Sequence, residues 1–263
     1  MRIIITGASS GLGEALALHY ATEGNQLVLI ARREERLCDV ARRCRARGAE
    51  VETVVADVND FERMGRIGEE LAQKPIDRII LNAGVSVGHS GGVTPFEDFH
   101  RLFGTNFLSV HALLEPIIPK LVARGGGEIV FISSLASLFT MPTSIAYSSS
   151  KRALNAYAEG LHYQLRPYGI RVMTIMPGFI DSEMTRKNRF RMPFFLSTEK
   201  GVARIARAIE QKKVRYAFPF RFYLMIRIVS MLPQVLRDKI VHFKNFKKGE
   251  TAHNTGEISD GHR

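Results

Sequence analysis

Residues 2–13 read RIIITGASSGLG, an apolar run that leads directly into a cluster of glycines. The run predicts a buried strand, and a helical pattern begins at Leu12 with almost no intervening loop. Gly7 allows a sharp turn, Gly11 lets the backbone approach a phosphate, and Gly13 lets the helix pack closely on the strand. Free N–H groups at the start of such a helix, together with its dipole, favour a pyrophosphate. Glycine turns also occur in many strand–helix connections, so the rest of the chain has to identify this one.

Short apolar runs alternate with helical patterns along most of the 263 residues. The runs are apolar on both faces, which is typical of parallel strands that helices cover on either side. Right-handed crossovers then predict an α/β fold, a three-layer doubly wound parallel sheet of the Rossmann-like kind. The predicted strands are RIIIT, QLVLI, VETVVA, DRIILN, EIVFIS and IRVMTIM, and the predicted helices span residues 12–24, 33–47, 61–73, 95–123 with a break near Gly104, 146–166 and 198–211.

No internal repeat, linker or change of composition appears before about Ser182, so a single domain is the economical interpretation. We expect this domain to span residues 1–218. Residues 219–248 are basic and partly apolar, and they predict a helical extension. Residues 249–263 are polar and aperiodic, and we expect them to form a flexible tail.

The formal net charge of +11 comes from the C-terminal quarter of the chain. Residues 186–248 hold 17 Lys and Arg against 3 Asp and Glu, whereas the rest of the chain is slightly acidic. A basic block of this kind fits nucleic acid, anionic lipid or an acidic substrate, and it also fits an ordinary solvated face. No recognised DNA- or RNA-binding motif accompanies the charge, so we expect no nucleic-acid partner.

The two cysteines, Cys38 and Cys44, stand six residues apart in a predicted helix and therefore point in different directions. They match no metal-ligand spacing, so we expect reduced, structural thiols and no bound metal. No targeting segment is visible, and Pro219 and two arginines interrupt the longest apolar region, at residues 216–233. That region is too short for a membrane span. We expect a cytoplasmic protein that is soluble or, at most, peripheral to the inner face of a membrane.

The end of the second predicted strand, LIARREERL at residues 29–37, indicates which dinucleotide the glycine loop would bind. An acidic residue there accepts the ribose 2′-hydroxyl of NAD, whereas arginine accommodates the 2′-phosphate of NADP. Arg32 and Arg33 stand at this position, and a guanidinium grips a phosphate with two parallel hydrogen bonds. We therefore expect NADP(H) rather than NAD(H), unless both arginines lie on a helix surface and pair with Glu34 and Glu35.

Tyr147 and Lys151 stand four residues apart in AYSSSKRAL, residues 146–154. On a helix such residues share a face, so a phenol lies beside an ammonium group. A free tyrosine has a pKa of about 10, and a neighbouring positive charge lowers it toward the working pH of an acid–base catalyst. Reducing a carbonyl requires a proton at oxygen as well as a hydride at carbon, which this pair would serve. The same pair could also be an accident of surface packing.

Several motifs stand in the order typical of one enzyme family. They are TGASSGLG, the DV of Asp57–Val58, NAG at residues 82–84, TN ending at Asn106, ISS ending at Ser134, YSSSK, and PGFIDS at residues 177–182. With them, residues 1–218 resemble a short-chain dehydrogenase/reductase of the compact type. The resemblance implies an oxidoreductase that transfers a hydride between NADPH and a ketone or aldehyde, or a secondary alcohol in reverse. The alternative is a non-catalytic NADP-binding sensor or scaffold on the same fold.

The resemblance also implies a role for each matching residue. Tyr147 would be the acid–base residue, Lys151 its electrostatic partner, and Ser134 the hydroxyl that orients the substrate carbonyl. Asn106 would hold a water that links Lys151 to solvent. Many NADP-using relatives carry a cation where this chain has Ser10. The expected cofactor-binding residues are Gly7, Ser9, Ser10, Gly11, Leu12, Gly13, Arg32, Arg33, Asp57, Val58, Asn82, Ala83, Gly84, Tyr147, Lys151, Pro177, Gly178, Ile180 and Ser182.

In this family the region after the PG motif forms a lid, here residues 182–198, which mix aromatic and basic side chains. Such a lid suits a small-molecule substrate that is hydrophobic or lipid-like, although its aromatics would equally pack on the core. The extension at residues 219–248 interleaves aromatics, aliphatics and cations, as in helices that lie on anionic membranes. A dimer contact or a cover over the pocket would use the same residues. Helices 95–123 and 146–166 resemble those that the family pairs, so we expect a homodimer or homotetramer.

Overall fold

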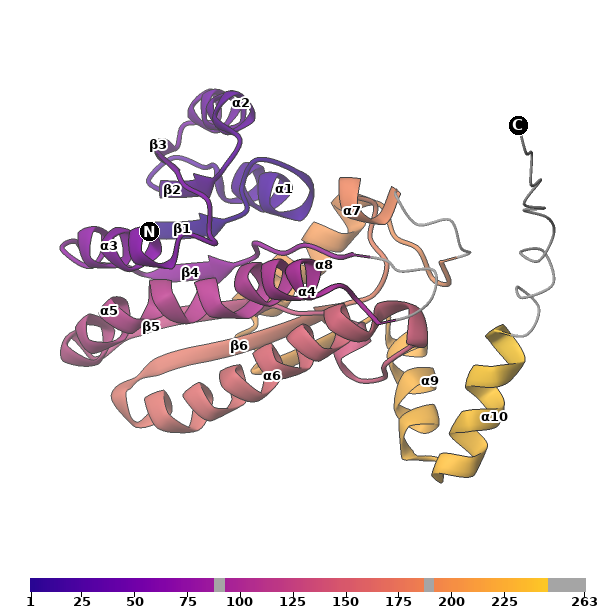
Figure 1. Ribbon diagram of the computed structural model, residues 1–263. Helices are drawn as coiled ribbons and strands as arrows, with labels where there is room; N and C mark the ends of the chain where they lie inside the picture. The colour runs from indigo at the N-terminus through magenta and orange to yellow at the C-terminus, as the bar shows by residue number, and fades with distance from the viewer. Residues whose placement is uncertain (88–92, 187–191, 246–263) are drawn as a thin grey trace, which may run out of the picture.

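The computed structural model describes residues 1–87, 93–186 and 192–245. Its centre is a sheet of seven strands, all parallel, in the order β3-β2-β1-β4-β5-β6-β7 (Figure 1). The predicted doubly wound sheet in a single domain is therefore confirmed. The strands are β1 (Arg2–Thr6), β2 (Gln26–Ala31), β3 (Glu50–Val55), β4 (Arg78–Leu81), β5 (Gly127–Ile132), β6 (Ile170–Pro177) and β7 (Arg215–Phe218).

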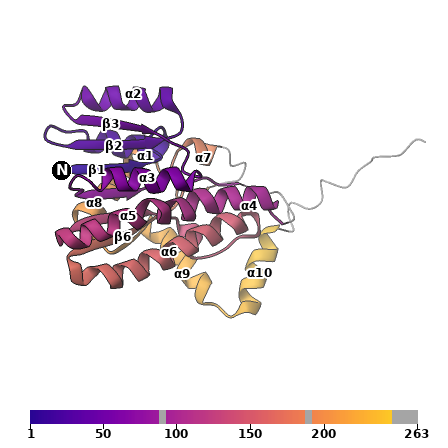
Figure 2. The ribbon, with the colours of Figure 1, turned by 60° about the vertical axis from the view of Figure 1, so that its left-hand side comes forward.

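Helices cover both faces of the sheet, which gives the three layers (Figure 2). One face carries α1 (Gly11–Tyr20), α2 (Glu34–Arg45) and α8 (Thr198–Glu210). The other face carries α3 (Phe61–Leu71), α5 (Ser109–Arg124) and α6 (Ile145–Leu165). The remaining helices are α4 (Phe96–Phe103), which runs into α5, the short α7 (Glu183–Arg186), and the C-terminal pair α9 (Phe220–Met231) and α10 (Gln234–Asn245).

The first strand shows why the sheet lies in the middle. Ile3, Ile4 and Ile5 are each 0% exposed. Because successive side chains of a strand point to opposite faces, Ile3 and Ile5 pack with α1, α2 and α8, whereas Ile4 packs with α3, α5 and α6. Burying each isoleucine contributes roughly 1.5–3 kcal/mol. A run of three isoleucines is therefore stable only between two layers of helices.

Two local features differ from the sequence prediction. The strand β7 is absent from the six predicted runs, although it pairs with Thr174–Pro177 of β6. It has only four residues, and they open a longer apolar region, so neither length nor periodicity separates a strand there. The break predicted near Gly104 is instead a π-helical segment, Gly104–Leu108, through which α4 continues into α5.

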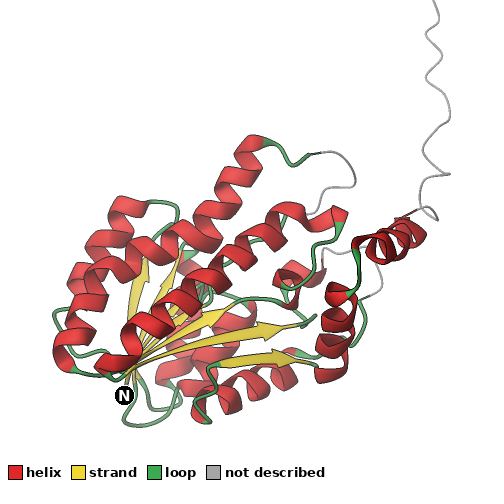
Figure 3. Ribbon diagram, turned by 90° about the horizontal axis from the view of Figure 1, so that it is seen from below, coloured by secondary structure: helices red, strands yellow, loops and turns green. Residues whose placement is uncertain are grey.

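The strand order positions the site. From β1 the chain builds outward through β2 to β3, and then returns to place β4 on the other side of β1. Ligands of such sheets bind where the order reverses, beyond the carboxyl ends of the strands. The strands diverge from the edge near the N-terminus, and their arrowheads point toward the opposite edge (Figure 3). The loops after β1, β4, β5 and β6 meet at this edge.

The C-terminal extension projects from the β7 side of the domain (Figure 1). Helix α9 contacts β7, while α10 turns back beyond it. Phe220, Ile228 and Met231 of α9 are exposed. Within the described residues, no helix is both long and apolar enough to cross a membrane. The predicted flexible tail, residues 249–263, lies outside the described residues, as do residues 246–248 of the predicted extension.

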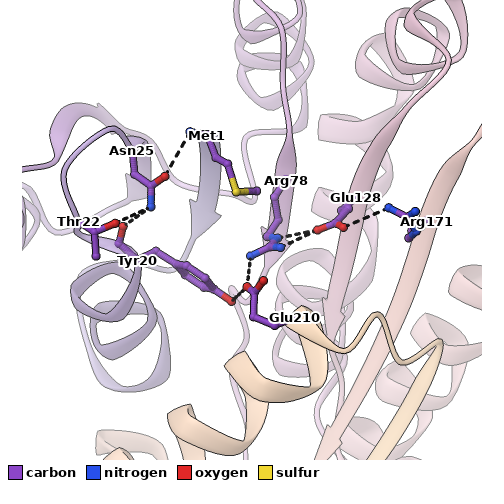
Figure 4. A network of polar contacts seen from close by, with 8 residues as sticks. All are labelled: Met1, Tyr20, Thr22, Asn25, Arg78, Glu128, Arg171 and Glu210. Atoms are coloured by element: carbon purple, nitrogen blue, oxygen red, sulfur yellow. Dashed lines mark hydrogen bonds and ion pairs between the residues drawn. The ribbon is translucent and has the colours of Figure 1, made fainter.

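A buried arginine ties the sheet together at the edge opposite the cleft (Figure 4). The guanidinium of Arg78 on β4 lies 2.8 Å from a carboxylate oxygen of Glu128 on β5 and 2.8 Å from one of Glu210 on α8. The same guanidinium lies over the ring of Tyr20 on α1, at 5.2 Å from its centroid. Arg171 of β6 approaches the second oxygen of Glu128 at 3.6 Å. One cation thus connects two strands to helices α1 and α8.

Candidate active site

A cavity of about 760 Å³ opens at the carboxyl edge of the sheet. Its wall comes from the loops after β1 to β6 and from the start of α6. Nearly all of the predicted site residues line it, although they are spread over most of the chain. They are Gly7, Ser9, Ser10, Gly11, Leu12, Arg32, Arg33, Asp57, Val58, Asn82, Ala83, Gly84, Ser134, Tyr147, Lys151, Pro177, Gly178, Ile180 and Ser182.

Two predicted site residues, Gly13 and Asn106, do not line the cavity themselves but lie next to residues that do. Gly13 lies in the first turn of α1, where an added Cβ would collide with the carbonyl oxygen of Gly7 and lie 2.5 Å from the side-chain nitrogen of Asn82. Asn106 is 0% exposed. Both therefore act on the cavity through their neighbours.

The glycine loop has the geometry that its sequence predicts. Gly7 and Gly11 have φ values of +68° and +56°, a backbone conformation that favours glycine. A Cβ on Gly7 would lie 2.8 Å from the Cα of Ala83, so the loops after β1 and β4 touch. Helix α1 begins at Gly11, and the side chain of the preceding Ser10 makes no capping hydrogen bond. The first N–H groups of α1 therefore face the cavity without a cap, which suits a pyrophosphate.

Thr6, the last residue of β1, holds the loop after β4 in place. Its hydroxyl oxygen accepts hydrogen bonds from the backbone N–H groups of Asn82 and Ala83, each at 3.0 Å. The side-chain amide of Asn82 in turn donates to the carbonyl oxygen of Thr6 at 3.1 Å. These bonds hold the NAG motif against the glycine loop, on the floor of the cleft.

The two arginines predicted to bind a 2′-phosphate both lie at the cavity but have different partners. Arg32 donates to a carboxylate oxygen of Asp57 at 3.1 Å. Arg33 donates to the hydroxyl oxygens of Ser9 and Ser10 and to Glu183 of α7. Among the described residues, Arg32 pairs with Asp57 and Arg33 with Glu183, and not with Glu34 or Glu35 as the alternative interpretation expects. Arg33 thus brings a cation to Ser10, the position at which the family resemblance implies a cation in NADP-using enzymes.

Asp57 is held as an anion at the end of β3. Burial works to raise the pKa of this carboxyl, but hydrogen bonds from Asn59 and Arg32 outweigh it, so the pKa lies below its usual range. Asn59 also donates to the hydroxyl oxygen of Thr105 at 2.8 Å. Sequence reasoning missed Asn59, Thr105 and Ser133, which also line the cavity. Asn59 directly follows the DV motif, a position that could have indicated it.

Lys151 and Asn106 lie together in the deepest part of the site. Lys151 is 4% exposed, and its ammonium group donates to the carbonyl oxygen of Ile132 at 2.9 Å. Burial lowers the pKa of Lys151 to about 8. Asn106, in the π-helical segment, accepts a hydrogen bond from the N–H of Val85 and donates to its carbonyl oxygen and to Ser150. A Cβ on Gly84 would lie 3.4 Å from both the lysine nitrogen and the Asn106 oxygen, so both groups border the same loop.

Tyr147 faces the cavity from the first turn of α6, beside Ser134. Burial raises the pKa of Tyr147, and a hydrogen bond from Ser134 works in the opposite direction. The net rise is the reverse of the sequence prediction, in which Lys151 lowers this pKa. The physical reason is that the lysine ammonium is directed to the backbone of β5, so the protein's own groups leave the desolvation of the phenolate dominant.

The PGFIDS segment closes the far side of the cavity. The N–H of Gly178 donates to the carbonyl oxygen of Phe218 at 2.7 Å, which anchors the segment to β7. Ser182 keeps its hydroxyl within 3.2 Å of that of Thr185. Of the predicted lid at residues 182–198, residues 187–191 lie outside the described residues.

Three aromatic rings meet beyond this segment. Phe222 of α9 stacks on Phe179, with centroids 5.8 Å apart, and on Phe194, at 5.7 Å. The rings connect the PGFIDS segment, the described part of the predicted lid and the C-terminal extension. Within residues 1–87, 93–186 and 192–245, no three His, Cys, Asp or Glu side chains lie close enough together to hold a metal ion.

The residues of the cleft fit a dinucleotide. The loop glycines let the backbones after β1 and β4 pack against each other. The N–H groups at the start of α1 carry no side-chain cap, and the cavity has arginines at one end and acid–base groups at the other. The 2′-phosphate of the adenosine ribose, the pyrophosphate and the nicotinamide ring follow one another along NADP, and they require cations, free N–H groups and acid–base groups respectively. The fit rests on backbone geometry as well as on residue type.

Comparison with known proteins agrees with this geometry. The family model described as short chain dehydrogenase matches residues 1–192. An uncharacterised oxidoreductase from Myxococcus xanthus is 34% identical over 239 residues, which cover 89% of this chain and 94% of the relative.

Solved structures show the same fold. A short-chain dehydrogenase from Sphingobium yanoikuyae in complex with NADPH has a TM-score of 0.77 at 24% identity, covering 97% of this chain and 98% of the other. L-Sorbose reductase from Gluconobacter frateurii, complexed with NADPH and L-sorbose, has a TM-score of 0.73 at 25% identity, covering 82% of this chain and 94% of the reductase.

Proposed function

Because this chain belongs to the short-chain dehydrogenase family, whose members are oxidoreductases that bind NAD or NADP, we propose that it reduces a ketone or aldehyde with NADPH. The reverse reaction oxidises a secondary alcohol. The observation that carries the proposal is the convergence of Ser134, Tyr147 and Lys151 on one wall of the cleft, backed by Asn106. The first three come from two different elements, and only an acid–base site gives a reason for their meeting.

The chain's own residues supply the proton chemistry of the proposed reaction. A bound nicotinamide would supply the hydride. Ser134 donates a hydrogen bond to the substrate oxygen and so orients the carbonyl beside Tyr147. Tyr147 gives its hydroxyl proton to that oxygen as negative charge develops on it. Lys151, one helical turn from Tyr147, directs its ammonium group to the Ile132 carbonyl oxygen, and its pKa of about 8 lets it exchange a proton near neutrality.

Asn106 has a positioning role in this proposal. Its amide bridges Val85 in the loop after β4 and Ser150 in α6, one residue before Lys151. Asn106 therefore fixes the position of α6, which carries Tyr147 and Lys151, relative to the loop after β4. A water held beside it would connect Lys151 to solvent.

The preference for NADPH is supported by Arg32 and Arg33 at the end of β2, where their guanidinium groups border the cavity. A 2′-phosphate carries up to two negative charges and binds best to paired guanidinium donors. The L-sorbose reductase structure, in complex with NADPH, is a relative consistent with this choice.

The decisive experiment is a panel of ketones and aldehydes assayed with NADPH and NADH, with a Tyr147→Phe variant beside the wild type. We expect the variant to lose about 10²–10⁴-fold in kcat/KM, the usual contribution of a general acid, while its Kd for NADPH stays within twofold. A wild type that binds NADPH but turns over no carbonyl would favour the non-catalytic sensor. No feature of the site favours that alternative, since a sensor does not need a proton donor.

We propose a hydrophobic substrate, on the evidence of the aromatic cluster Phe179, Phe194 and Phe222. The rings lie beside Gly178, at the end of the cleft away from the arginines. Turnover should therefore rise with the chain length of a series of 2-ketones, and Phe222→Ala should flatten that dependence. Equal turnover of short polar and long apolar ketones would refute the proposal.

We propose that α9 rests on an anionic membrane surface. Phe220, Leu224, Ile228 and Met231 are 66%, 45%, 56% and 77% exposed, and their spacing places them on one face of α9. Its only charged residues are arginines, which border that face as in interfacial helices. A symmetric contact between two copies would instead bring these like charges together without an acid on α9 to pair them.

Co-sedimentation with vesicles distinguishes membrane binding by α9 from a contact between two copies of the chain. The wild type should sediment with phosphatidylserine-containing vesicles at low salt and much less with phosphatidylcholine alone, and Ile228→Glu should abolish binding. No sedimentation at either salt concentration would discard the membrane proposal. A dimer that Ile228→Glu dissociates would assign α9 to a second copy instead.

We also propose a homodimer or homotetramer through the outer surface of α4 and α6. Phe96 and Tyr163 are 78% and 67% exposed there, more than large apolar rings usually are. Analytical ultracentrifugation of the wild type and of Tyr163→Lys tests this. A monomeric wild type at micromolar concentration would contradict it.

A further inference from the structure

Arg33 lies at the centre of a small polar network at the adenosine end of the cleft. Its guanidinium donates to the hydroxyl oxygens of Ser9, at 3.4 Å, and Ser10 on one side. On the other side it donates to a carboxylate oxygen of Glu183 at 2.9 Å. The residue proposed to bind the 2′-phosphate therefore already holds an anion.

Glu183 reaches this network from a distant part of the chain. It is the first residue of α7, directly after the PGFIDS segment, and 150 residues separate it from Arg33. Its second carboxylate oxygen accepts a hydrogen bond from Arg36 in the first turn of α2. Hydrogen bonds from Arg33 and Arg36 hold the pKa of Glu183 below its usual range, so the group is an anion at neutral pH.

The Glu183 carboxylate would compete with a 2′-phosphate for the guanidinium of Arg33. Glu183 and Arg33 both line the cavity, together with Ser10. A carboxylate whose two oxygens each take a guanidinium imitates two of the oxygens of a phosphate. Arg32 also has an acidic partner, since one of its nitrogens pairs with Asp57. An incoming 2′-phosphate must displace Glu183 from Arg33 or lie next to its negative charge.

We propose that Glu183 is an internal competitor for the 2′-phosphate seat and sets how strongly the protein prefers NADPH over NADH. The proposal rests on the proposed function, in which Arg33 binds that phosphate. Glu183 opposes NADPH alone, because NADH has a hydroxyl in place of the phosphate and does not need the Arg33 guanidinium. Glu183 thus acts on the cofactor through Arg33, as a specificity-determining residue.

The expected effect of Glu183 on NADPH affinity follows from the solvent exposure of the Arg33–Glu183 ion pair. The Arg33 and Glu183 side chains are 39% and 46% exposed, so each ion pair is of the surface kind. A surface pair is worth up to about fivefold in an equilibrium constant, and Glu183 makes two. We therefore expect a gain of roughly three- to tenfold in NADPH affinity when the charge is removed.

The test is binding by titration calorimetry of NADPH, NADH, adenosine 2′,5′-bisphosphate and adenosine 5′-monophosphate. Glu183→Gln removes the charge and keeps the shape. It should tighten NADPH and the bisphosphate about three- to tenfold and leave NADH and the monophosphate within twofold. Glu34→Gln is the charge-matched control: it removes one negative charge next to Arg33 in the sequence, and we expect it to shift no Kd more than twofold.

An Arg33→Met background completes the cycle. There NADPH should bind more weakly, and adding Glu183→Gln should have a smaller effect than it has in the wild type, because the guanidinium for which Glu183 competes is gone. An unchanged NADPH Kd in Glu183→Gln, or an equal gain for NADH, would overturn the proposal while leaving NADPH preference intact. A wild type that binds NADH as tightly as NADPH, with Arg33→Met without effect on either, would overturn the proposed preference and the competitor together.

Discussion

Lys151 is 4% exposed, and its ammonium group has the carbonyl oxygen of Ile132 as hydrogen-bond partner. Burial lowers its pKa from 10.5 to about 8. Below pH 8 the lysine is charged in both the folded and the unfolded chain, so the folded state bears the full desolvation penalty. As pH rises from 8 to 10.5 the folded lysine loses its proton first, and the penalty disappears.

We therefore predict that Lys151→Met stabilises the fold at pH 7 by about 1–3 kcal/mol, after allowing for the lost hydrogen bond to Ile132. The gain should shrink toward zero or below as the pH approaches 10.5. Urea unfolding of both proteins at pH 7 and pH 10 measures it. A variant that is less stable than the wild type at pH 7 would mean that the buried ammonium is compensated by partners beyond Ile132.

At the scale of elements, the approach of α1 to β1 depends on a residue with no side chain. A Cβ at Gly13 would overlap the carbonyl oxygen of Gly7, which belongs to the backbone and cannot rotate away. The same Cβ would press on the amide of Asn82, whose hydrogen bond to Thr6 holds the NAG loop. A shift of the start of α1 would therefore also displace the glycine loop and the loop after β4.

Gly13→Ala should lower the free energy of unfolding by about 2 kcal/mol or more and weaken NADPH binding at least tenfold, because overpacking shifts the phosphate loop. Gly160→Ala in α6 is the matched control, since nothing lies within 4 Å of an added Cβ there. Alanine is the better helix former, so this control should gain up to about 1 kcal/mol. Thermal unfolding and nucleotide titration of both variants decide the prediction, and equal behaviour would refute it.

The loop after β3 is tied to the π-helical segment by one side chain. The amide nitrogen of Asn59 donates to Asp57 at 3.2 Å and to Thr105 at 2.8 Å. Because Thr105 precedes Asn106, this amide links the adenine end of the cleft to the residue that positions the catalytic helix. Asn59 and Thr105 are neighbours in space, although 46 residues separate them in the sequence.

Asn59→Ala should reduce stability by about 1–2 kcal/mol, the usual loss when a partly buried hydrogen-bonding group is removed. It should also raise the KM for NADPH several-fold and lower kcat less, since Asp57 stands closer to Asn59 than the acid–base groups do. Steady-state kinetics separate the two effects. A fall in kcat with KM unchanged would show that the link to Asn106 matters more than the one to Asp57.

At the scale of the whole molecule, the Arg78 network joins strands β4 and β5 to the helical layer on one side of the sheet (Figure 4). Arg78 is 3% exposed, and Glu128 beside it is 9% exposed. Burial raises the pKa of the nearby Tyr20 to about 12, so its phenol stays neutral beside the ion pairs of Arg78. The network lies at the edge opposite the cleft, where it concerns stability and not chemistry.

Arg78→Met should lower the free energy of unfolding by about 3–5 kcal/mol, because Glu128 would remain buried and, among the described residues, would keep the more distant Arg171 as its ion-pair partner. The control is Arg63→Met, which breaks an exposed pair with Glu70 and should cost less than about 1 kcal/mol. A double variant, Arg78→Met with Glu128→Leu, should recover most of the loss. Failure of the double variant to recover would show that packing of the guanidinium, rather than the unpaired acid, is responsible.

Much of the fold could be predicted from periodicity. The strand RIIIT is β1 residue for residue, and the helix predicted at residues 198–211 is α8 within one residue. Strand β7 could not be predicted, since four residues reading RYAF become a strand only because the edge of β6 is open beside them. The same holds for the π-helical segment: its register is fixed by the bonds of Asn106 to Val85 and Ser150, which sequence spacing does not contain.

The sequence by itself determined which residue types stand at the ends of the strands, and with them the doubly wound sheet, the glycine loop and the residues that line the cleft. Those features depend on local patterns and on motif order. Only the tertiary structure decided where each charge is directed: Lys151 to the backbone of β5, Arg33 to Ser10 and Glu183, Arg32 to Asp57. The reason is that a side chain's protonation and partners depend on burial and on groups from distant elements, which are brought together only when the chain has folded.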